Sequence, residues 1–363
     1  MAEGSTTVAS DSLAAEKKRQ LDQNFFKKGI LVALFSGLLY GFYTAFITAA
    51  QNTGAWVGWA TTVTAGSFLA VFILPAIAST LNDGISAVWA LIITAAQGKL
   101  ADFGRTLETK PGVIMICAAA VGGPIASVAY VIALSQAGTL AVPIAALNPA
   151  VGAILARVLY KQPLKPHMVA GIVVCVIAGV MIGSTGLTGD VPAGTGFGLA
   201  LAFLAAVGWG AEGCIAGYGT AMIDSQIGIT IRQTTSGILN LIVVLPVLTL
   251  VGAGSLGETF GYVGDALTDL PSLVFFILSG LCAYLSFARW YRGNSMCGTA
   301  LGMACNGTYT FHGPFFTWLN VGLAMGINGY ALAPIAWIAA AVMVVGIFLV
   351  AVNPADYLSK KEQ

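Results

Sequence analysis

Ten long, almost charge-free apolar segments run through this chain, and they restrict its fold to one built within a lipid bilayer. Hydrophobic residues make up 57% of its 363 residues and charged residues only 9%, against about a quarter charged in a typical soluble domain. A helix needs about 20 mainly apolar residues to cross the bilayer core, and in lipid it must satisfy its own backbone groups. The sequence predicts an all-α integral membrane protein with ten transmembrane helices.

Polar loops separate the predicted spans. The spans cover residues 29–50, 73–98, 112–134, 138–160, 167–186, 196–218, 227–252, 271–292, 298–319 and 329–352. Residues 51–72, between the first two spans, form a moderately apolar insert, which either extends a helix or dips into the outer face of the membrane.

The basic residues set the expected orientation. Every Lys and Arg except Arg232 falls on one side of the membrane if both termini are cytoplasmic. The outer loops then carry four acidic residues, Asp190, Glu258, Asp265 and Asp269, and no basic residue. This asymmetry is the positive-inside signature. We expect a multi-pass protein of the plasma membrane, with residues 1–28 and 353–363 as cytoplasmic tails.

Several other classes of protein fit the sequence poorly. The six cysteines lie in or beside spans without metal-ligand spacing, and we find no nucleophile elbow or phosphate-binding loop. We expect no enzyme, catalytic residue, cofactor or metal site. An ion channel would more often show rings of charges or carbonyls from symmetric subunits. The basic residues are spread over loops, so we expect no nucleic-acid partner.

The two halves of the chain contain matching segments. Residues 130–139 align without gaps with residues 290–299, and Tyr40-Gly41 matches Trp209-Gly210. Five spans per half is an odd number, so the halves must enter the membrane in opposite orientations. Transporters with inverted repeats bind substrate near the midplane between the repeats. The predicted five-helix repeats are residues 29–186 and 196–352.

Three ionisable residues, Asp83, Glu212 and Arg232, lie within the predicted spans. Charges at membrane depth are costly, so such residues usually face a protein interior or an aqueous cavity and serve a pathway or a binding site. The sequence therefore predicts a membrane transporter, with these three as candidates for proton coupling or gating. His312 is a fourth, because histidine titrates near physiological pH. A neutral, hydrogen-bonded histidine is an equal alternative.

Two of these residues, Asp83 and Arg232, belong to helical stripes of polar residues. The first comprises Ser79, Asn82, Asp83, Ser86 and Trp89, and the second comprises Arg232, Gln233, Ser236 and Asn240. Asp83 either binds a cation or proton, or packs structurally against Asn82 and neighbouring hydroxyls. Both interpretations remain open at this point.

Glu212 follows Trp209 by one helical turn, so the carboxylate and the indole share a face. A carboxylate beside aromatic rings can hold a quaternary ammonium group, because the rings attract the cation and the acid balances its charge. Tyr40 and Tyr43 give the repeat-related first span a similar face. The other candidates for substrate binding are Asp83, Tyr130, Trp89, Tyr284, Tyr309 and Asn148.

Glu212 and Arg232 also stand ten residues either side of Met222, in the turn between two spans. In an antiparallel hairpin they would lie at equal depth and could form a buried ion pair or an inner gate. Asp83 would then be the better cation or proton site. Alternatively, Arg232 contacts an anionic group of a zwitterionic substrate.

The chain resembles the drug/metabolite transporter (EamA-like) superfamily over roughly residues 29–352, and within it the bacterial choline uptake proteins. Four stretches carry the narrower resemblance: 81–92, 148–152, 208–219 and 229–235. The resemblance implies two inverted five-helix repeats and a secondary active transporter, a symporter that imports a choline-like organic cation, with protons as the coupling ion. The alternative is an exporter of metabolites, amino acids or drugs.

Overall fold

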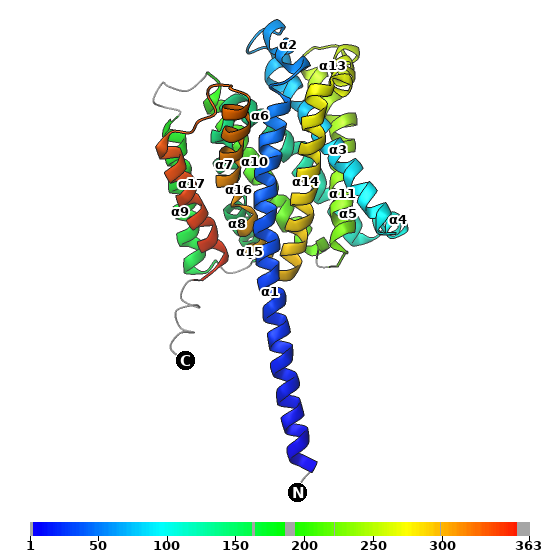
Figure 1. Ribbon diagram of the computed structural model, residues 1–363, viewed down its shortest axis with the longest axis vertical. Helices are drawn as coiled ribbons and strands as arrows, with labels where there is room; N and C mark the ends of the chain where they lie inside the picture. Colours follow the sequence, from blue (N-terminus) through cyan, green and yellow to red (C-terminus); the bar gives the residue numbers. More distant parts are fainter. Residues whose placement is uncertain (1–2, 162–163, 186–192, 221, 298, 354–363) are drawn as a thin grey trace.

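All regular structure is helical in the residues that the computed structural model describes: 3–161, 164–185, 193–220, 222–297 and 299–353 (Figure 1). Within these described residues, seven helices are long and apolar enough to cross a membrane: Gln20–Ala50, Leu69–Ala96, Lys110–Ala145, Thr195–Ala216, Ser225–Val251, Leu270–Cys297 and Pro334–Ala351. The predicted all-helical fold is therefore confirmed, and the architecture is consistent with that of an α-helical membrane protein.

The main bundle contains both continuous and interrupted helices. Its elements are α1 (Glu3–Ala50), α3 (Leu74–Ala96), α5 (Lys110–Ala120), the π-helix η2 (Val121–Ser127), α6 (Val128–Ala137), α9 (Pro166–Thr185), α10 (Thr195–Thr220), α11 (Ser225–Leu239), the π-helix η4 (Asn240–Val244), α12 (Leu245–Val251), α14 (Leu270–Cys297) and α17 (Pro334–Ala351). Three short helices lie between them: α2 (Ala55–Thr62), α4 (Leu100–Leu107) and α13 (Leu256–Thr268).

Two of the predicted spans are interrupted. Span 138–160 consists of the short 3-10 helix η3 (Gly138–Leu140), α7 (Ala141–Ala145) and α8 (Asn148–Tyr160), with a turn at residues 146–147. Span 298–319 contains α15 (Thr299–Asn306) and α16 (Tyr309–Thr317), with a turn at residues 307–308, and runs into the π-helix η5 (Trp318–Ala324). Pro149 has no amide hydrogen to donate to residue 145, and Gly307 is a poor helix former, so both turns have a local cause.

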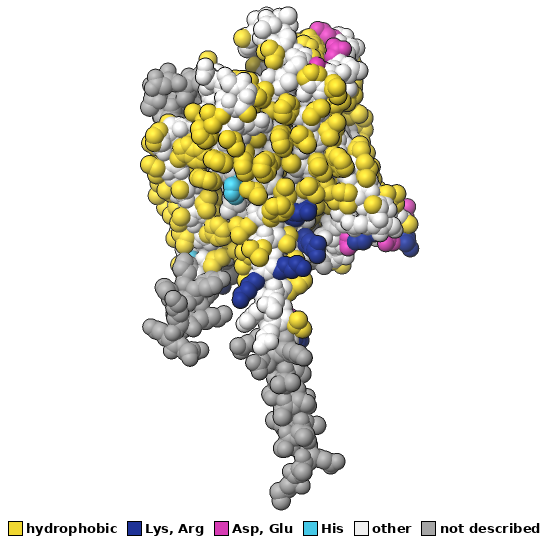
Figure 2. Space-filling model, viewed as in Figure 1, with side chains coloured by type: hydrophobic (Ala, Val, Ile, Leu, Met, Phe, Trp, Pro, Cys, Tyr) yellow, Lys and Arg dark blue, Asp and Glu magenta, His cyan; other side chains and the backbone are white. Residues whose placement is uncertain are grey.

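The molecule has two distinct ends. The N-terminal part of α1 projects from the bundle at the end where α17 also finishes (Figure 1); we call it the tail end. The opposite end, where α1 finishes and α10 begins, is the vestibule end. Hydrophobic side chains cover the visible face between the two ends, and Lys and Arg side chains gather toward the tail end (Figure 2).

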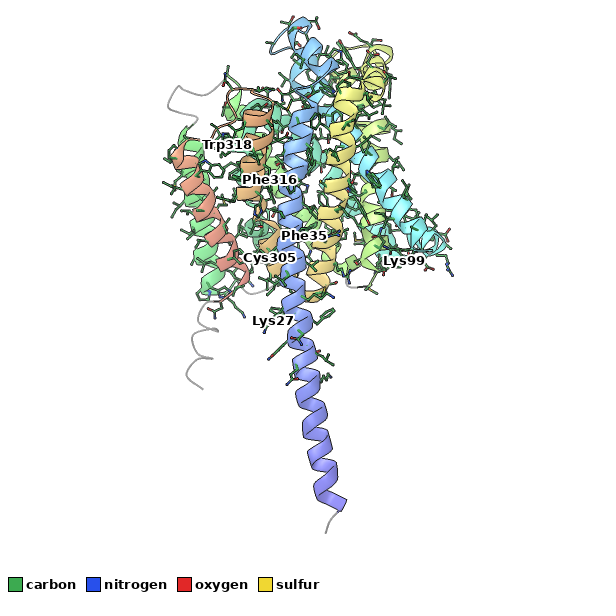
Figure 3. The ribbon with its side chains drawn as sticks, viewed as in Figure 1. Lys27, Phe35, Lys99, Cys305, Phe316 and Trp318 are labelled. Carbon is green, nitrogen blue, oxygen red and sulfur yellow. The ribbon has the colours of Figure 1, made fainter. Side chains whose placement is uncertain are left out.

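The helices pack in a specific set of pairs. α1 lies along α14 and α16, α10 lies along α5, α6 and α8, α3 lies along α11, and α9 lies along α17. Phe316 of α16, for example, stacks on Phe42 of α1 with ring centroids 4.0 Å apart (Figure 3). Charged and aromatic side chains from α1, α3, α10, α11 and α14 meet in the core.

Candidate functional site

The two predicted polar stripes lie against each other where α3 packs on α11. The Asp83 carboxylate accepts hydrogen bonds from the Ser236 hydroxyl, from Asn240 Nδ2 at 3.1 Å and from Asn82 Nδ2 at 3.1 Å. Gln233 Nε2 donates to the Ser86 hydroxyl. Asp83 is only 3% exposed, so protein donors have replaced water around its carboxylate.

The network extends to α14 and α1 through Ser279. The Ser279 hydroxyl lies 2.6 Å from Asn82 Oδ1 and 3.5 Å from the backbone oxygen of Tyr43. The Asp83 network thereby connects α3, α11, α14 and the part of α1 that carries the predicted tyrosines. Ser279 was not among the residues predicted from sequence, because an isolated serine in an apolar span gives no pattern.

Glu212 and Arg232 form the buried ion pair that the sequence left as an alternative. Arg232 Nε donates to Glu212 Oε1 at 3.0 Å, and both side chains are 0% exposed. Arg232 Nη1 donates to Gln233 Oε1 at 2.5 Å, and the Phe287 ring lies beneath the guanidinium, 3.9 Å from Cζ to the ring centroid. The Arg232 guanidinium is thus engaged within the protein, where both the acid and the ring stabilise it.

The π-helix η2 brings the ion pair and the Asp83 network together. A Cβ atom on Gly122 would collide with the Glu212 carboxylate, and one on Gly123 would collide with Ser236. The Gly122 backbone oxygen accepts from Ser127 Oγ at 2.9 Å and from Arg232 Nη2 at 3.4 Å. Two glycines before Pro124 can be recognised in the sequence as a place where another segment could approach the helix closely. Only the structure shows that the approaching side chains are Glu212 and Ser236.

Five of the predicted aromatic residues gather beside this charged centre, and we call them the aromatic cluster: Tyr40, Tyr43, Tyr130, Trp209 and Tyr309. The Tyr40 ring is central, with centroid distances of 4.9 Å to Tyr43, 6.0 Å to Tyr130, 5.9 Å to Trp209 and 4.3 Å to Tyr309. All five side chains are at most 4% exposed. The rings contact one another, so the cluster is closed in this conformation.

Trp209 links the aromatic cluster to the ion pair. Its Nε1 donates to the Gly122 backbone oxygen at 3.1 Å, the same atom that accepts from Arg232. Among the described residues, the buried hydroxyls of Tyr40 and Tyr309 and the Oε2 atom of Glu212 have no hydrogen-bond partner. Buried polar groups are normally paired, so these three atoms mark unused hydrogen-bonding capacity beside the charged centre.

Four other predicted site residues lie outside the aromatic cluster. The Tyr284 hydroxyl donates to Gln226 Oε1 at 2.8 Å, toward the tail end. Trp89 is half-buried on α3, and Asn148 starts α8 with its backbone oxygen near Gly210. His312 packs its backbone against Gly41 and its ring near Phe316, with centroids 6.2 Å apart.

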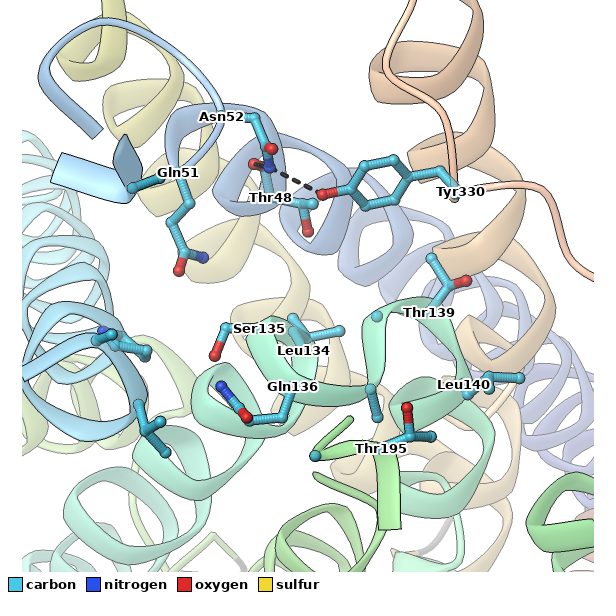
Figure 4. Close-up of a pocket in the computed structure, with 18 of the residues that line it drawn as sticks. Thr48, Gln51, Asn52, Leu134, Ser135, Gln136, Thr139, Leu140, Thr195 and Tyr330 are labelled. Carbon is cyan, nitrogen blue, oxygen red and sulfur yellow. Dashed lines mark hydrogen bonds between the residues drawn. The ribbon is translucent and has the colours of Figure 1, made fainter. Parts of the chain in front are cut away.

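A cavity of about 1680 Å³ opens at the vestibule end, and we call it the vestibule. Its walls come from the ends of α1 and α6, the short helices α2 and η3, residues 63–72, the starts of α3, α10 and α17, and residues 327–333 (Figure 4). Thr48 is its lining residue nearest the aromatic cluster along α1. One turn deeper along α1, the Thr44 hydroxyl lies 2.9 Å from the hydroxyl of Tyr130, a member of the cluster, so the cluster begins about one helical turn beyond the vestibule lining.

The tail end is closed by a second polar layer between α3 and α11. Thr94 and Thr230 share a hydrogen bond of 2.7 Å, and Gln226 Nε2 donates to Thr94 Oγ1 at 3.0 Å. Further out, Lys99 Nζ lies 2.9 Å from Asp224 Oδ2 (Figure 3).

The pKa of Asp224 is lowered. Partial burial alone would raise it, but hydrogen bonds from Lys99 and from the amides of Gln226 and Ile227 outweigh that effect. The Asp224 carboxylate caps the N-terminus of α11 through those amides. In the part of the chain that the structure describes, no three His, Cys, Asp or Glu side chains lie close enough to hold a metal ion.

Comparisons with known proteins bear on the fold alone. No protein-family model and no curated protein matches the chain. Among solved structures that are similar, one described as "Crystal structure of protein" has a TM-score of 0.51 and 16% identity over 89% of this chain and 95% of that chain. The arrangement of helices therefore occurs, over nearly its whole length, in another protein.

Proposed function

We propose that this protein is a secondary active transporter that carries a small organic cation of the choline type, coupled to protons, by alternating access. The observation that carries the proposal is the charge of the buried centre. When ionised, the two carboxylates and one guanidinium of Asp83, Glu212 and Arg232 bear a formal charge of −1, and these side chains are at most 3% exposed.

A net charge in a low-dielectric interior is costly unless a counter-ion neutralises it. Glu212 already pairs with Arg232 at 3.0 Å, so the unbalanced charge resides on Asp83. One positive charge, either a proton or a monovalent organic cation, balances it. The same pairing argues against a zwitterionic substrate, because it leaves Arg232 engaged rather than available for an anionic group.

The aromatic cluster supports a quaternary ammonium as the cation. Ring faces attract such a group without needing hydrogen-bond donors on it. The unpartnered hydroxyls of Tyr40 and Tyr309 could bond a hydroxyl group on the same substrate. The Tyr40 and Tyr309 rings lie 4.3 Å apart between centroids, so a bound cation must part them, and the described conformation represents a closed site.

Alternating access is supported by correspondences between the two halves, which we propose to be inverted repeats of five spans each. The two interrupted spans have turns at residues 146–147 and 307–308, nearly the 160-residue offset of the matched segments. The close contact of Gly41 with His312 corresponds to that of Gly210 with Gly152. The helix contacts agree as well. In the proposed repeats α1 corresponds to α10, α14 corresponds to α5 with α6, and α16 corresponds to α8. Accordingly, α1 contacts α14 and α16, and α10 contacts α5, α6 and α8.

The expected direction is import, with the vestibule facing outward. Lys and Arg side chains gather toward the tail end (Figure 2), which favours the cytoplasm for that end. The vestibule then opens outside the cell, and the Thr94–Thr230 layer closes the inner side.

The test is uptake of radiolabelled choline into proteoliposomes that contain the purified protein, with and without a pH gradient. We expect saturable uptake that the gradient alters and that Asp83→Asn abolishes. Asp102→Asn is the matched control, because Asp102 pairs with Arg105 on the exposed α4 helix. Neither uptake nor displaceable binding of choline or related amines by the native protein would refute the proposal. Counterflow of amino acids instead would favour the exporter.

A further inference from the structure

We infer that the vestibule is a binding site in its own right, for an uncharged ring compound that carries hydroxyl or amide groups. The inference does not depend on the proposed function. None of the described residues that line the vestibule is Asp, Glu, Lys, Arg or His. The polar part of the lining consists of amides and hydroxyls, which contrasts with the ionised centre deeper in the bundle.

The amides that face the vestibule have hydrogen-bonding capacity to spare. Gln51 uses Nε2 to bond the Ile47 backbone oxygen at 3.2 Å, which leaves its side-chain carbonyl available. Gln136 makes no side-chain hydrogen bond to a described residue, and Figure 4 shows the Gln51 side chain extending toward the helix that carries Ser135 and Gln136. Amides supply both donors and acceptors, so these walls can bond hydroxyl or amide groups of a ligand.

Aromatic rings form another part of the lining. The Trp56 and Trp59 rings lie 5.0 Å apart between centroids, and the Phe72 ring lies 4.6 Å from Phe68 and 5.7 Å from Phe197. Trp56 is buried, but Trp59 and Phe72 are half-buried and Phe197 is exposed, so these three rings can stack on the flat apolar surface of a ligand. A mainly apolar lining with a few oriented polar groups is the usual composition of a small-molecule site.

The described lining offers no counter-charge that could hold an ion in the vestibule, although an ion can cross this open cavity with its hydration shell. An ion that leaves water loses hydration energy, which only a counter-charge or several aligned dipoles can replace. An uncharged polar molecule loses less and recovers its hydrogen bonds from the amides. The cavity of about 1680 Å³ is larger than the roughly 300–1,000 Å³ of common ligand pockets, so such a ligand would fill only part of it.

The position of the two glutamines in the vestibule indicates where a ligand would lie. Asn52 Nδ2 of the chain after α1 donates to the Tyr330 hydroxyl at 2.9 Å (Figure 4), and residues 327–333 form one wall. A compound held between Gln51 and Gln136 would lie between the solvent and the Thr44–Tyr130 contact. It would therefore occupy the route toward the aromatic cluster without entering it.

The test is calorimetric titration of the full-length protein in lipid nanodiscs with matched pairs of neutral and charged compounds. The pairs are uridine and uridine monophosphate, methyl glucoside and glucuronate, and N-acetyltryptophanamide and N-acetyltryptophan. We expect at least one neutral member to bind at least about tenfold more tightly than its charged partner, a difference of about 1.4 kcal/mol. The double variant Gln51→Ala with Gln136→Ala should weaken that binding by about tenfold or more.

Gln97→Ala is the control, because Gln97 is an exposed amide at the tail end of α3, and it should leave binding unchanged. Failure of every neutral compound to bind, or equal affinity for the charged partners, would overturn the inference. So would binding that Asp83→Asn abolishes and the glutamine variants leave intact, because the ligand would then lie at the centre. None of these results depends on choline transport, so the proposed function is tested separately.

Discussion

Helix α11 takes part in charged contacts at two depths, and the two contacts differ in exposure. In the core, Asp83 and Arg232 are 3% and 0% exposed and are surrounded by protein partners. At the tail end, the side chains of Lys99 and Asp224 are 33% and 44% exposed although they lie only 2.9 Å apart. The same kinds of charge therefore occur in a sealed setting and in a hydrated one.

This difference assigns the two contacts different roles. A buried charge that loses its partner keeps its desolvation cost, so the central groups must stay paired or take up a cation. An exposed pair is worth little because water replaces either partner. The tail-end pair can open at low cost, which in the proposed transport cycle would suit the end of the bundle through which the substrate leaves.

Breaking the central ion pair should have the largest effect on stability. Glu212→Gln leaves the Arg232 guanidinium, which is 0% exposed, without its counter-charge. We expect a loss of about 3–5 kcal/mol in the free energy of unfolding. Denaturant titration of the purified protein in mixed micelles measures this loss. A change as small as that of an exposed pair would show that water reaches Arg232 and that the centre is not sealed.

A double variant separates charge from packing at the same position. Glu212→Leu combined with Arg232→Met replaces both charged side chains by apolar ones, and the methionine still covers Phe287, which lies 3.9 Å from the Arg232 guanidinium. Replacing a whole buried pair by apolar groups is often neutral or stabilising, so we expect the double variant to recover most of the loss. No recovery would mean that the hydrogen bonds of Arg232, rather than its charge, dominate.

Gly122→Ala should have an intermediate effect. The added Cβ would collide with the Glu212 carboxylate, and overpacking of this kind costs about 1–3 kcal/mol. Gly84→Ala is the matched control on α3, because nothing lies within 4 Å of its added Cβ and the change removes chain entropy from the unfolded state. The same titration should show Gly84→Ala to be neutral or stabilising. Equal losses for both would contradict the close approach of η2 to the ion pair.

The sequence could predict which faces of the two helices are polar, but not how those faces meet. Helical spacing of Asn82, Asp83 and Ser86, and of Gln233 and Ser236, defined two stripes. The contact between them depends on the order of helices in the bundle. The turn between two spans suggested the pairing of Glu212 with Arg232 because equal distance along antiparallel helices implies equal depth. This pairing could be inferred because Glu212 and Arg232 lie on consecutive helices, and the structure contains the pair.

Aromatic side chains were harder to assign, because a ring in a membrane helix fits a site, a core or an interface equally well. Tyr130 lies in the aromatic cluster, whereas Tyr284 bonds Gln226 near the tail end. No spacing rule distinguishes the two from sequence. The close approach at Gly122 and the bridging Ser279 were also beyond prediction, since each depends on tertiary contacts between distant segments.

Opening the tail-end pair should have the smallest effect. Lys99→Gln removes the lysine that helps to lower the pKa of Asp224, and we expect a loss below about 1 kcal/mol in the free energy of unfolding. A lowered folded-state pKa stabilises the protein above the ordinary carboxyl pKa, and this stabilisation is lost as the pH falls through the folded-state value. The difference between native protein and variant should thus be present at neutral pH, shrink in acid and decrease at high salt. Thermal unfolding across pH and salt measures it. A loss as large as that of Glu212→Gln, or one unaffected by acid and salt, would mean that the tail end is sealed like the core, and the contrast between the two contacts would fail.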